Sequence, residues 1–286
     1  MSKINKFGFV ALMGEPNVGK SSILNTILEK KLSIVSHKVQ TTRFRLNGIL
    51  CERESQIAFI DTPGICDAKS LRERSYNKVA WQCIYDTNIV ALVIDAKKGI
   101  NNQTELIYKR LKSNSDDSIE LVVILNKIDL VDKSKLLSLA AHVSKSYGIS
   151  EIFFVSAKKR LGFDDLKKWL AENIPNGDWV FDAKQISDAP LNFIVGELTR
   201  EKIFLRLHDE LPYDLEVKTI EWKNNNDSSC SIFQDIYVLR DSQKGIVLGK
   251  KGEVIKKISI AARKEISNFL GKKVHLFLRV RSKKSA

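Results

Sequence analysis

The residues of this chain best suited to chemistry lie in two glycine-rich loops of different character. The first, GEPNVGKS, has the spacing G-x-x-x-x-G-K-[ST] and stands between an apolar run and a segment with helical spacing. Its glycines let backbone N–H groups turn toward a phosphate chain at the positive end of the following helix. Lys20 can reach the β- and γ-phosphates, and the Ser21 hydroxyl can ligate Mg²⁺. The predicted phosphate-binding residues are Gly14, Glu15, Pro16, Asn17, Val18, Gly19, Lys20 and Ser21.

The stretch IDTPG is expected to respond to the third phosphate. Asp61 follows a buried run, where its carboxylate can hold the magnesium ion through water, and Gly64 offers a backbone N–H to the γ-phosphate. Ras-like proteins place a water-orienting glutamine after this glycine, whereas Ile65 has no group that could orient water. We therefore expect slow intrinsic hydrolysis that an external factor stimulates. This second switch comprises Asp61, Thr62, Pro63, Gly64 and Ile65.

Two further stretches identify the base of the nucleotide as guanine. NKID follows the apolar run ELVVIL and supplies Asn126, Lys127 and Asp129. The Asp129 carboxylate can accept hydrogen bonds from N1–H and the 2-amino group of guanine, a pair of donors that adenine lacks. VSAK adds a backbone N–H for the guanine O6, and its residues are Ser156, Ala157 and Lys158. The order of these motifs predicts a GTP site.

With these motifs the chain resembles the translation-factor type of GTPase, and the resemblance gives the segment KVQTTRFR a role. It implies a first switch of Gln40, Thr41, Thr42 and Arg43, in which Thr42, or alternatively Thr41, closes on magnesium when the γ-phosphate is present. An exposed polar loop is the competing interpretation. Asn17 resembles an asparagine that helps hold K⁺ in related GTPases; this potassium site is a hypothesis, and a purely structural Asn17 is its alternative.

The second loop, GKKG, lies in GIVLGKKGEVIKKI and has the character of an RNA clamp. Without side chains, Gly249 and Gly252 allow sugar and phosphate groups to approach the backbone, and the helix that follows directs its N-terminus at the same anion. The cations expected to face the phosphates are Lys250, Lys251, Lys256 and Lys257. An apolar groove of Ile246, Val247, Val254, Ile255 and Ile258 is expected to hold the bases. A plain turn between two helices is the competing interpretation.

The positive charge of the chain gathers around this second loop. The formal net charge is +13, and residues 240–286 contain 14 Lys and Arg against 3 Asp and Glu, so the other residues are nearly balanced at 33 against 31. Clustered cations release counterions from a polyphosphate and supply affinity that does not depend on its sequence. Lysines kept for solubility would be scattered. The pattern indicates a nucleic-acid partner for the C-terminal part.

The elements that must position these loops suggest two domains. Five apolar runs alternate with helix-length segments through residues 1–174, namely FGFVALM, SQIAFID, NIVALVID, ELVVILNK and IFFVSA. Runs without polar alternation suit strands covered on both faces, so we predict an α/β P-loop GTPase domain with a mostly parallel sheet. In such sheets ligands bind at the carboxyl ends of the strands, where each motif falls.

A stretch rich in proline, glycine and polar residues, 175–190, is predicted to link the two domains. Residues 191–286 then read as a helix, a hairpin formed by DLEVKTIEW and SIFQDIYVL, a short helix, GKKG, a longer helix and the strand KVHLFLRVR. This order resembles that of a KH domain, in its α+β type II form, whose G-x-x-G loop clamps about four nucleotides of single-stranded RNA.

Composition excludes several other classes. The chain is 43% hydrophobic and 28% charged, ordinary values for a globular protein, and no apolar run reaches the ~18 residues needed to span a bilayer. The N-terminus lacks the pattern of a signal peptide. Cys51, Cys66, Cys83 and Cys230 lie outside any CxxC pair, which predicts free thiols rather than zinc ligands or disulfides. A cytoplasmic location is expected.

Taken whole, the chain resembles the Era family of bacterial GTPases through GEPNVGKSSILN, QTTRFR, DTPG, NKID, VSAK, TREKIFLRLHDELPY and GKKGEVIKKISIAARKEI. The resemblance implies a monomeric factor for assembly of the 30S ribosomal subunit that uses Mg²⁺. In its GTP form it would hold the 3′ end of 16S rRNA. Direct magnesium ligands would be Ser21 and Thr42. The family is also associated peripherally with the inner face of the cell membrane, which a basic surface could favour.

Three alternatives remain at this point. A membrane-surface signalling GTPase would bind lipid rather than RNA through its basic end. A passive RNA-binding module with a vestigial nucleotide site is disfavoured by the complete motif set. A tRNA-modifying GTPase would carry a folate-type domain and a terminal cysteine, and neither is present.

Overall fold

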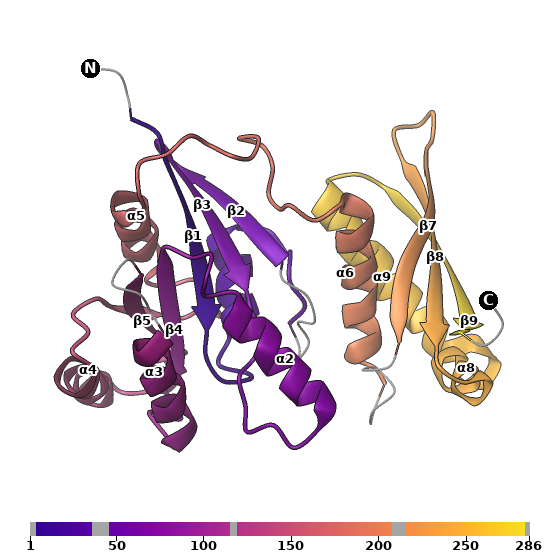
Figure 1. Cartoon of the computed structure of the whole chain (residues 1–286). Coiled ribbons are helices and arrows are strands. Elements are labelled where there is room, and N and C mark those ends of the chain that lie inside the picture. The colour runs from indigo at the N-terminus through magenta and orange to yellow at the C-terminus, as the bar shows by residue number, and fades with distance from the viewer. Residues whose placement is uncertain (1–3, 36–45, 115–118, 208–214, 284–286) are drawn as a thin grey trace. The chain divides into compact units, whose positions relative to one another are not determined.

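The computed structural model describes residues 4–35, 46–114, 119–207 and 215–283 (Figure 1). These residues form two compact units. One contains the described chain up to Ser33 and from Leu46 to Asp188; the other contains Ala189 onward, together with Ile34 and Val35. Each unit has its own sheet and its own core.

A six-stranded sheet organises the first unit. Its order is β2-β3-β1-β4-β5-β6, and every pair is parallel except β2 with β3. The strands are β1 (Lys6–Met13), β2 (Leu46–Glu52), β3 (Ser55–Asp61), β4 (Ile89–Asp95), β5 (Glu120–Asn126) and β6 (Ile152–Val155). All residues of β3 and β4 are buried, as expected for strands covered on both faces. The prediction of a mostly parallel α/β domain is confirmed.

Helices cover both faces of this sheet. Residues of α2, α3 and α4 share one apolar core with β4 and β5, whereas α1 and α5 contact β3. The helices are α1 (Lys20–Ile27), α2 (Leu71–Gln82), α3 (Asn102–Asn114), α4 (Lys133–Tyr147) and α5 (Phe163–Asn173), with a 3₁₀ turn at Ile128–Leu130. The loops that carry the predicted motifs follow β1, β3, β5 and β6 at their carboxyl ends.

The antiparallel strand β2 was not predicted, because Asn47 and Gly48 interrupt its apolar pattern. Its other edge is covered by the end of the segment expected to be a linker. The Ile49 N–H donates to the carbonyl of Ile186 at 3.0 Å, and the Asn47 amide donates to the Asp188 carboxylate at 2.6 Å. These bonds satisfy backbone groups that an edge strand would otherwise expose.

More of the same segment is held by one buried glutamine, Gln56 of β3. Its side-chain oxygen accepts from the N–H groups of Val180 and Phe181 at 3.0 and 2.9 Å, and its amide donates to the Phe181 carbonyl at 2.8 Å. The Trp179 indole N–H donates to the Glu54 carbonyl. The composition of residues 175–190 predicted an irregular linker. The structure shows that hydrogen bonds to β2 and β3 hold this segment against the first unit.

A three-stranded sheet of order β7-β8-β9 organises the second unit, in which β7 and β8 are antiparallel and β8 and β9 are parallel. The predicted hairpin and final strand are confirmed. The elements are α6 (Leu191–Phe204), β7 (Glu216–Asn224), β8 (Cys230–Val238), α8 (Asp241–Leu248), a 3₁₀ turn (Lys250–Gly252), α9 (Glu253–Leu270) and β9 (Val274–Ser282). Helices α6 and α9 lie against one face of the sheet, and their apolar residues form its core (Figure 1).

Helix α6 also buries a chain of charges. Lys202 donates to Glu201 at 2.8 Å and to Glu265 of α9 at 2.9 Å. Burial by itself lowers the pKa of Lys202, but its hydrogen bonds to the two carboxylates outweigh burial and raise that pKa. Glu201 also accepts the N–H of Val35, which belongs to this unit. The buried ions are therefore paired, as a stable interior requires.

Candidate functional site

The first glycine loop joins β1 to α1 in a conformation that only certain residues tolerate. Gly14 and Gly19 have φ of 143° and 104°, and Asn17 has φ of 64°. A side chain at Gly14 would place its Cβ 2.5 Å from the carbonyl oxygen of Val93. The two motif glycines are thus required by the backbone and by close packing. The loop ends at the N-terminus of α1, where an anion is favoured.

Lys20 and Ser21 begin α1, directly after the first glycine loop. The buried Lys20 amine donates to the carbonyls of Gly14 and Glu15 at 3.1 and 2.9 Å. Desolvation lowers the pKa of Lys20 to about 8, against the opposing attraction of Asp61 and Glu15. The Ser21 hydroxyl donates to the fully buried Asp61 carboxylate at 2.7 Å. One hydroxyl and one carboxylate, both predicted magnesium residues, are therefore adjacent.

Ser21 and Asp61 suit Mg²⁺, which takes further ligands from phosphates and water, better than a metal whose ligands all come from the protein. Magnesium is commonly bound by one or two protein oxygens together with phosphate oxygens and waters. In the described ranges of the chain, no group of three or more His, Cys, Asp or Glu could hold a metal ion. The donor set Ser21 and Asp61 thus suits an ion that arrives with the nucleotide.

The IDTPG stretch packs directly on the first loop. The Ile65 N–H donates to the Gly14 carbonyl at 3.0 Å, and a Cβ at Gly64 would lie 2.6 Å from Cα of Pro16. The side chain of Ile65 is only 4% exposed and belongs to the core cluster that includes Met13. Burial gives Ile65 a packing role, in keeping with its inability to orient water.

Asn126 and Lys127 connect the base-binding loops to the phosphate-binding loop. The Asn126 amide donates to the Val18 carbonyl at 2.8 Å and accepts the Ala157 N–H at 3.2 Å. The Lys127 amine donates to the Asn17 carbonyl at 2.7 Å. These two predicted guanine-site residues therefore hold three loops in one arrangement.

Asp129 is the exposed acceptor of the group. One of its carboxylate oxygens accepts the Ser156 hydroxyl at 2.5 Å, and the same hydroxyl accepts the Lys159 N–H at 3.1 Å. Lys158 is exposed beside them. The hydroxyl fixes the carboxylate without covering it, so Asp129 can accept the paired donors of guanine.

Sequence reasoning missed two supporting residues. Asp95 ends β4 at the same edge of the sheet and pairs with Lys127 at 2.6 Å. The side-chain oxygen of Asn25 accepts the N–H groups of Leu32 and Ser33, both at 2.8 Å, and so fixes the chain that leads toward the first switch. The terminal carboxylate of NIVALVID could have indicated Asp95. The first-switch residues Gln40, Thr41, Thr42 and Arg43 lie outside the described residues.

The GKKG loop joins α8 to α9 through three left-handed residues. Gly249, Lys251 and Gly252 have φ of 71°, 51° and 78°. A Cβ at Gly249 would lie 2.8 Å from Cβ of Val254, so glycine is required there by packing as well as by backbone. At Gly252 only the Ile255 side chain comes within 4.0 Å. The predicted RNA-contacting lysines Lys250, Lys251, Lys256 and Lys257 are all exposed.

The apolar groove beside this loop differs in part from the prediction. Val247 and Ile258 are fully buried in the core, so they cannot contact bases. Ile246 is 56% exposed, and Leu248, which was not predicted, is 40% exposed. Helical spacing identified the apolar residues, but only packing decides which of them face inward.

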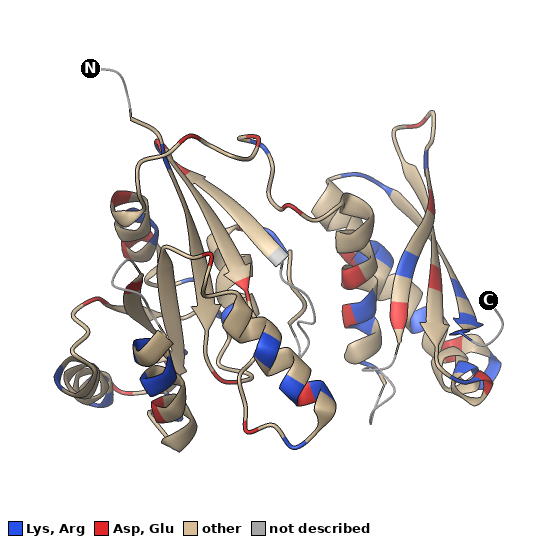
Figure 2. Cartoon of the chain, in the orientation of Figure 1, with Lys and Arg blue, Asp and Glu red and all other residues tan. Residues whose placement is uncertain are grey.

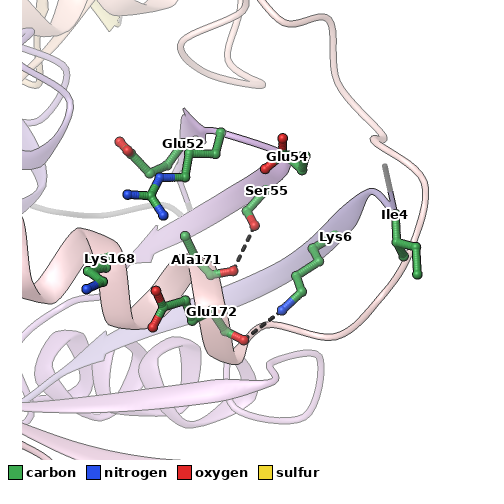
Figure 3. Close-up of a pocket in the computed structure, with 9 residues that line it drawn as sticks. Ile4, Lys6, Glu52, Glu54, Ser55, Lys168, Ala171 and Glu172 are labelled. Carbon is green, nitrogen blue, oxygen red and sulfur yellow. Dashed lines mark hydrogen bonds between the residues drawn. The ribbon is translucent and has the colours of Figure 1, made fainter. Parts of the chain in front are cut away.

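Another depression lies at the amino-terminal edge of the sheet and carries none of these motifs. The Lys6 amine donates to the Glu172 carbonyl at 2.7 Å, and the Ser55 hydroxyl donates to the Ala171 carbonyl at 2.8 Å (Figure 3). Both bonds tie the start of a strand to the end of α5. We assign this depression a structural role.

The two loops and their scaffolds define a GTPase whose nucleotide-binding domain is joined to a KH domain. Residues 9–127 match the family model described as 50S ribosome-binding GTPase, and residues 210–285 match the KH domain model. The chain belongs to the Era family of GTPases. It is 45% identical over 274 residues to GTPase Era of Dinoroseobacter shibae, covering 96% of this chain and 89% of the relative. It is 47% identical to GTPase Era of Brucella suis, covering 96% and 87%. As a member of this family the chain is a GTP-hydrolysing enzyme.

Solved structures agree over nearly the whole chain. Era in complex with MgGDPNP and nucleotides 1506–1542 of 16S ribosomal RNA matches with a TM-score of 0.88 at 35% identity, covering 97% of this chain and 94% of that one. Aquifex aeolicus Era bound to GDP·AlF4⁻ matches with a TM-score of 0.87 at 35% identity, with the same coverage. Of the helices in the described residues, none is long and apolar enough to cross a bilayer.

Proposed function

We propose that this chain is a GTP-controlled RNA-binding protein that holds the 3′ region of 16S rRNA and assists assembly of the 30S subunit. The observation that carries the proposal is that one chain brings together the described residues of the GEPNVGKS, DTPG, NKID and VSAK motifs and also exposes the lysines of the GKKG loop. The complex of a similar Era with a GTP analogue and 16S rRNA nucleotides supports it.

At the nucleotide site, Lys20 would contact the terminal phosphates, and Ser21, Thr42 and Asp61 would hold Mg²⁺, Asp61 through water. The ion would neutralise charge that develops on the transferred phosphoryl group. The residues of the chain supply position: Asn126 and Lys127 hold the loops together, and Asp129 selects guanine. Because Ile65 is apolar and buried, no side chain immediately after Gly64 can orient water, and we expect slow intrinsic hydrolysis.

Binding of GTP would order the first switch and so change how RNA is held, while hydrolysis would reset that affinity. A ligand can shift such an equilibrium only through its differential affinity for the two states. The proposal therefore requires that RNA affinity differ among the nucleotide-free, GDP and GTP-analogue forms.

Fluorescence anisotropy of labelled single-stranded RNA from the 3′ end of 16S rRNA, titrated with each nucleotide form, tests this requirement. The double variant Gly249→Asp, Gly252→Asp should lose RNA binding and retain its affinity for GTP. Gly271→Asp is a matched control, because Gly271 also has a positive φ, 64°, but caps the far end of α9. Equal dissociation constants for all nucleotide forms would contradict the switch. RNA binding that survives the double variant would contradict the clamp, and an equal loss of RNA binding in the Gly271→Asp control would show that the substitutions act through the fold.

A further inference from the structure

The face of the β7-β8-β9 sheet opposite the helices carries aromatic and arginine side chains in matched rows. Because side chains alternate along strands, residues paired in register lie on the same face. The parallel register of β8 and β9 pairs Phe233 with Phe277, Asp235 with Arg279, and Tyr237 with Arg281. We define these six residues as the outer β8–β9 face. Ile232 and Ile236, which alternate with residues of this face along β8, belong to the core on the other side.

Phe277 is the most exposed aromatic part of this face. Its ring stacks on Phe233 with centroids 4.7 Å apart and planes 12° apart, and it is 51% exposed. Packing between the two strands explains why one side of the Phe277 ring contacts Phe233. An isolated exposed apolar residue is ordinary in a protein. The neighbours of this ring, described next, make it different.

Asp235 holds two arginines in fixed positions beside the rings. It accepts from Arg279 through Nε and Nη2 at 2.7 and 2.9 Å, and it lies 2.9 Å from Nε of Arg281. The hydrogen bonds from Arg279 hold the pKa of Asp235 below its usual value although burial opposes this. The carboxylate is only 4% exposed, whereas Arg279 and Arg281 are 59% and 39% exposed. The face therefore presents positive charge on two pre-oriented guanidinium planes.

Strand β9 connects this face to the GKKG loop. Leu278 and Val280 pack in the same core cluster as Val254 and Ile255, the residues that follow the loop. Phe277, Arg279 and Arg281 alternate with them and point to the opposite face. Since β9 is an edge strand, no further strand separates the two faces. A polymer leaving the loop can therefore pass around that edge.

We propose that the outer β8–β9 face is a second RNA-binding surface, on which an unpaired base stacks against Phe277 and the adjacent phosphates contact Arg279 and Arg281. Exposed rings beside cations are how single-stranded nucleic acid is held without a base-specific code. On β7, Glu216 and Glu221 are paired with Lys218 and Lys223, so this strand adds little net positive charge; Figure 2 shows both acidic and basic positions along it. This inference rests on the proposed RNA-binding function and extends it to RNA longer than the clamp holds.

The test compares two RNA lengths with the full chain. A tetranucleotide fills the G-x-x-G clamp alone, whereas a 12-mer from the same 3′ region can extend beyond it. Phe277→Thr should weaken the 12-mer by about 5- to 150-fold, the loss of one base–aromatic stack, and leave the tetranucleotide unchanged. Phe277→Trp, which keeps a ring, should retain the affinity. Ile220→Thr on β7 is a matched control, because Ile220 is 52% exposed and lacks a ring.

Equal 12-mer affinity of the wild type and Phe277→Thr would overturn the inference while the clamp stands. Equal weakening of both RNA lengths would also overturn it, because the substitution would then act through the fold. Loss of binding to phosphatidylglycerol vesicles without loss of RNA binding would assign the face to lipid instead. A wild-type chain that binds neither RNA would remove the proposed function together with this extension.

Discussion

The two glycine loops use one local device, a glycine turn before a helix, in opposite settings. In the nucleotide loop Lys20 is 6% exposed and its amine donates to carbonyls of its own loop. In the KH loop Lys250 and Lys251 are exposed, and Lys251 has a positive φ of 51°. The contrast shows how the surroundings of a loop suit it to its ligand. A small ligand can be enclosed and contacted on every side, whereas a polymer needs a surface that is open at both ends.

Enclosure also explains why the first loop has so many partners. Asn126 and Lys127 connect it to the base-binding loops, and Ile65 binds it through its backbone. A site held by several loops can discriminate guanine from adenine because its acceptors are fixed before the ligand arrives. The turn of the KH loop is closed by two backbone hydrogen bonds within its own segment: the Gly249 N–H donates to the Gly245 carbonyl at 2.8 Å, and the Gly252 N–H donates to the Gly249 carbonyl at 3.1 Å.

The largest expected effect that separates the two loops is that of Lys20→Ala. Removal of the buried amine that we propose contacts the terminal phosphates should weaken GTP binding by about 1,000-fold, since hydrogen bonds between charged groups are the strong ones. Isothermal titration with GTP measures this loss. RNA binding by the nucleotide-free variant should equal that of the nucleotide-free wild type; a parallel loss of RNA affinity would show that the two loops are not separable.

Asp129→Asn tests whether the nucleotide site selects guanine through this carboxylate. The amide would present a donor to the donors of guanine, so GTP affinity should fall by about 100-fold and xanthosine triphosphate should become the preferred ligand. Competition binding between the two nucleotides measures the change. Asp132→Asn is the matched control, because Asp132 is a nearby aspartate that precedes α4 without capping it through its side chain. Undiminished GTP selectivity in Asp129→Asn would refute the role of Asp129.

Within the KH loop, the two glycines should differ. In Gly249→Ala the new Cβ would clash with Val254 and the residue would have to keep a positive φ. The free energy of unfolding should therefore fall by about 2–3 kcal/mol. In Gly252→Ala only the positive φ is unfavourable, so the free energy of unfolding should fall by about 1 kcal/mol. Denaturant unfolding of both variants measures the difference. Equal losses would mean that close packing does not set the conformation of Gly249.

Nucleotide affinity is also expected to depend on pH. Because the pKa of Lys20 is lowered to about 8, the nucleotide-free site holds fewer protons than the phosphate-bound site above that pH. Binding then takes up a proton, so GTP affinity should fall by up to about tenfold per pH unit between pH 8 and 9.5. The same shift, from 10.5 when unfolded, makes the nucleotide-free protein gain stability from this lysine as pH rises through that window.

Lys20→Arg provides the control, since arginine stays charged throughout. Calorimetry at pH 9 in two buffers of different ionisation enthalpy counts the protons taken up by wild type and variant. A pH profile of GTP affinity that is the same in both proteins would assign the titration to another group.

Local sequence determined much of this protein. The spacing in GEPNVGKS, DTPG, NKID, VSAK and GKKG predicted the residues of both sites, and the five unbroken apolar runs correspond to β1, β3, β4, β5 and β6. These features are readable because they depend on neighbours in the chain: a glycine turn, a helix start, a strand covered on both faces.

Only tertiary structure decided the rest. Val247 and Ile258 are core residues rather than groove residues because of what packs against them. Strand β2 pairs with residues 186–188, which lie far from it in the sequence. The register that aligns Phe233 with Phe277 is equally non-local. Periodicity tells which residues are apolar or polar, but the free energy of burial is decided by what packs against them, and that partner comes from elsewhere in the chain.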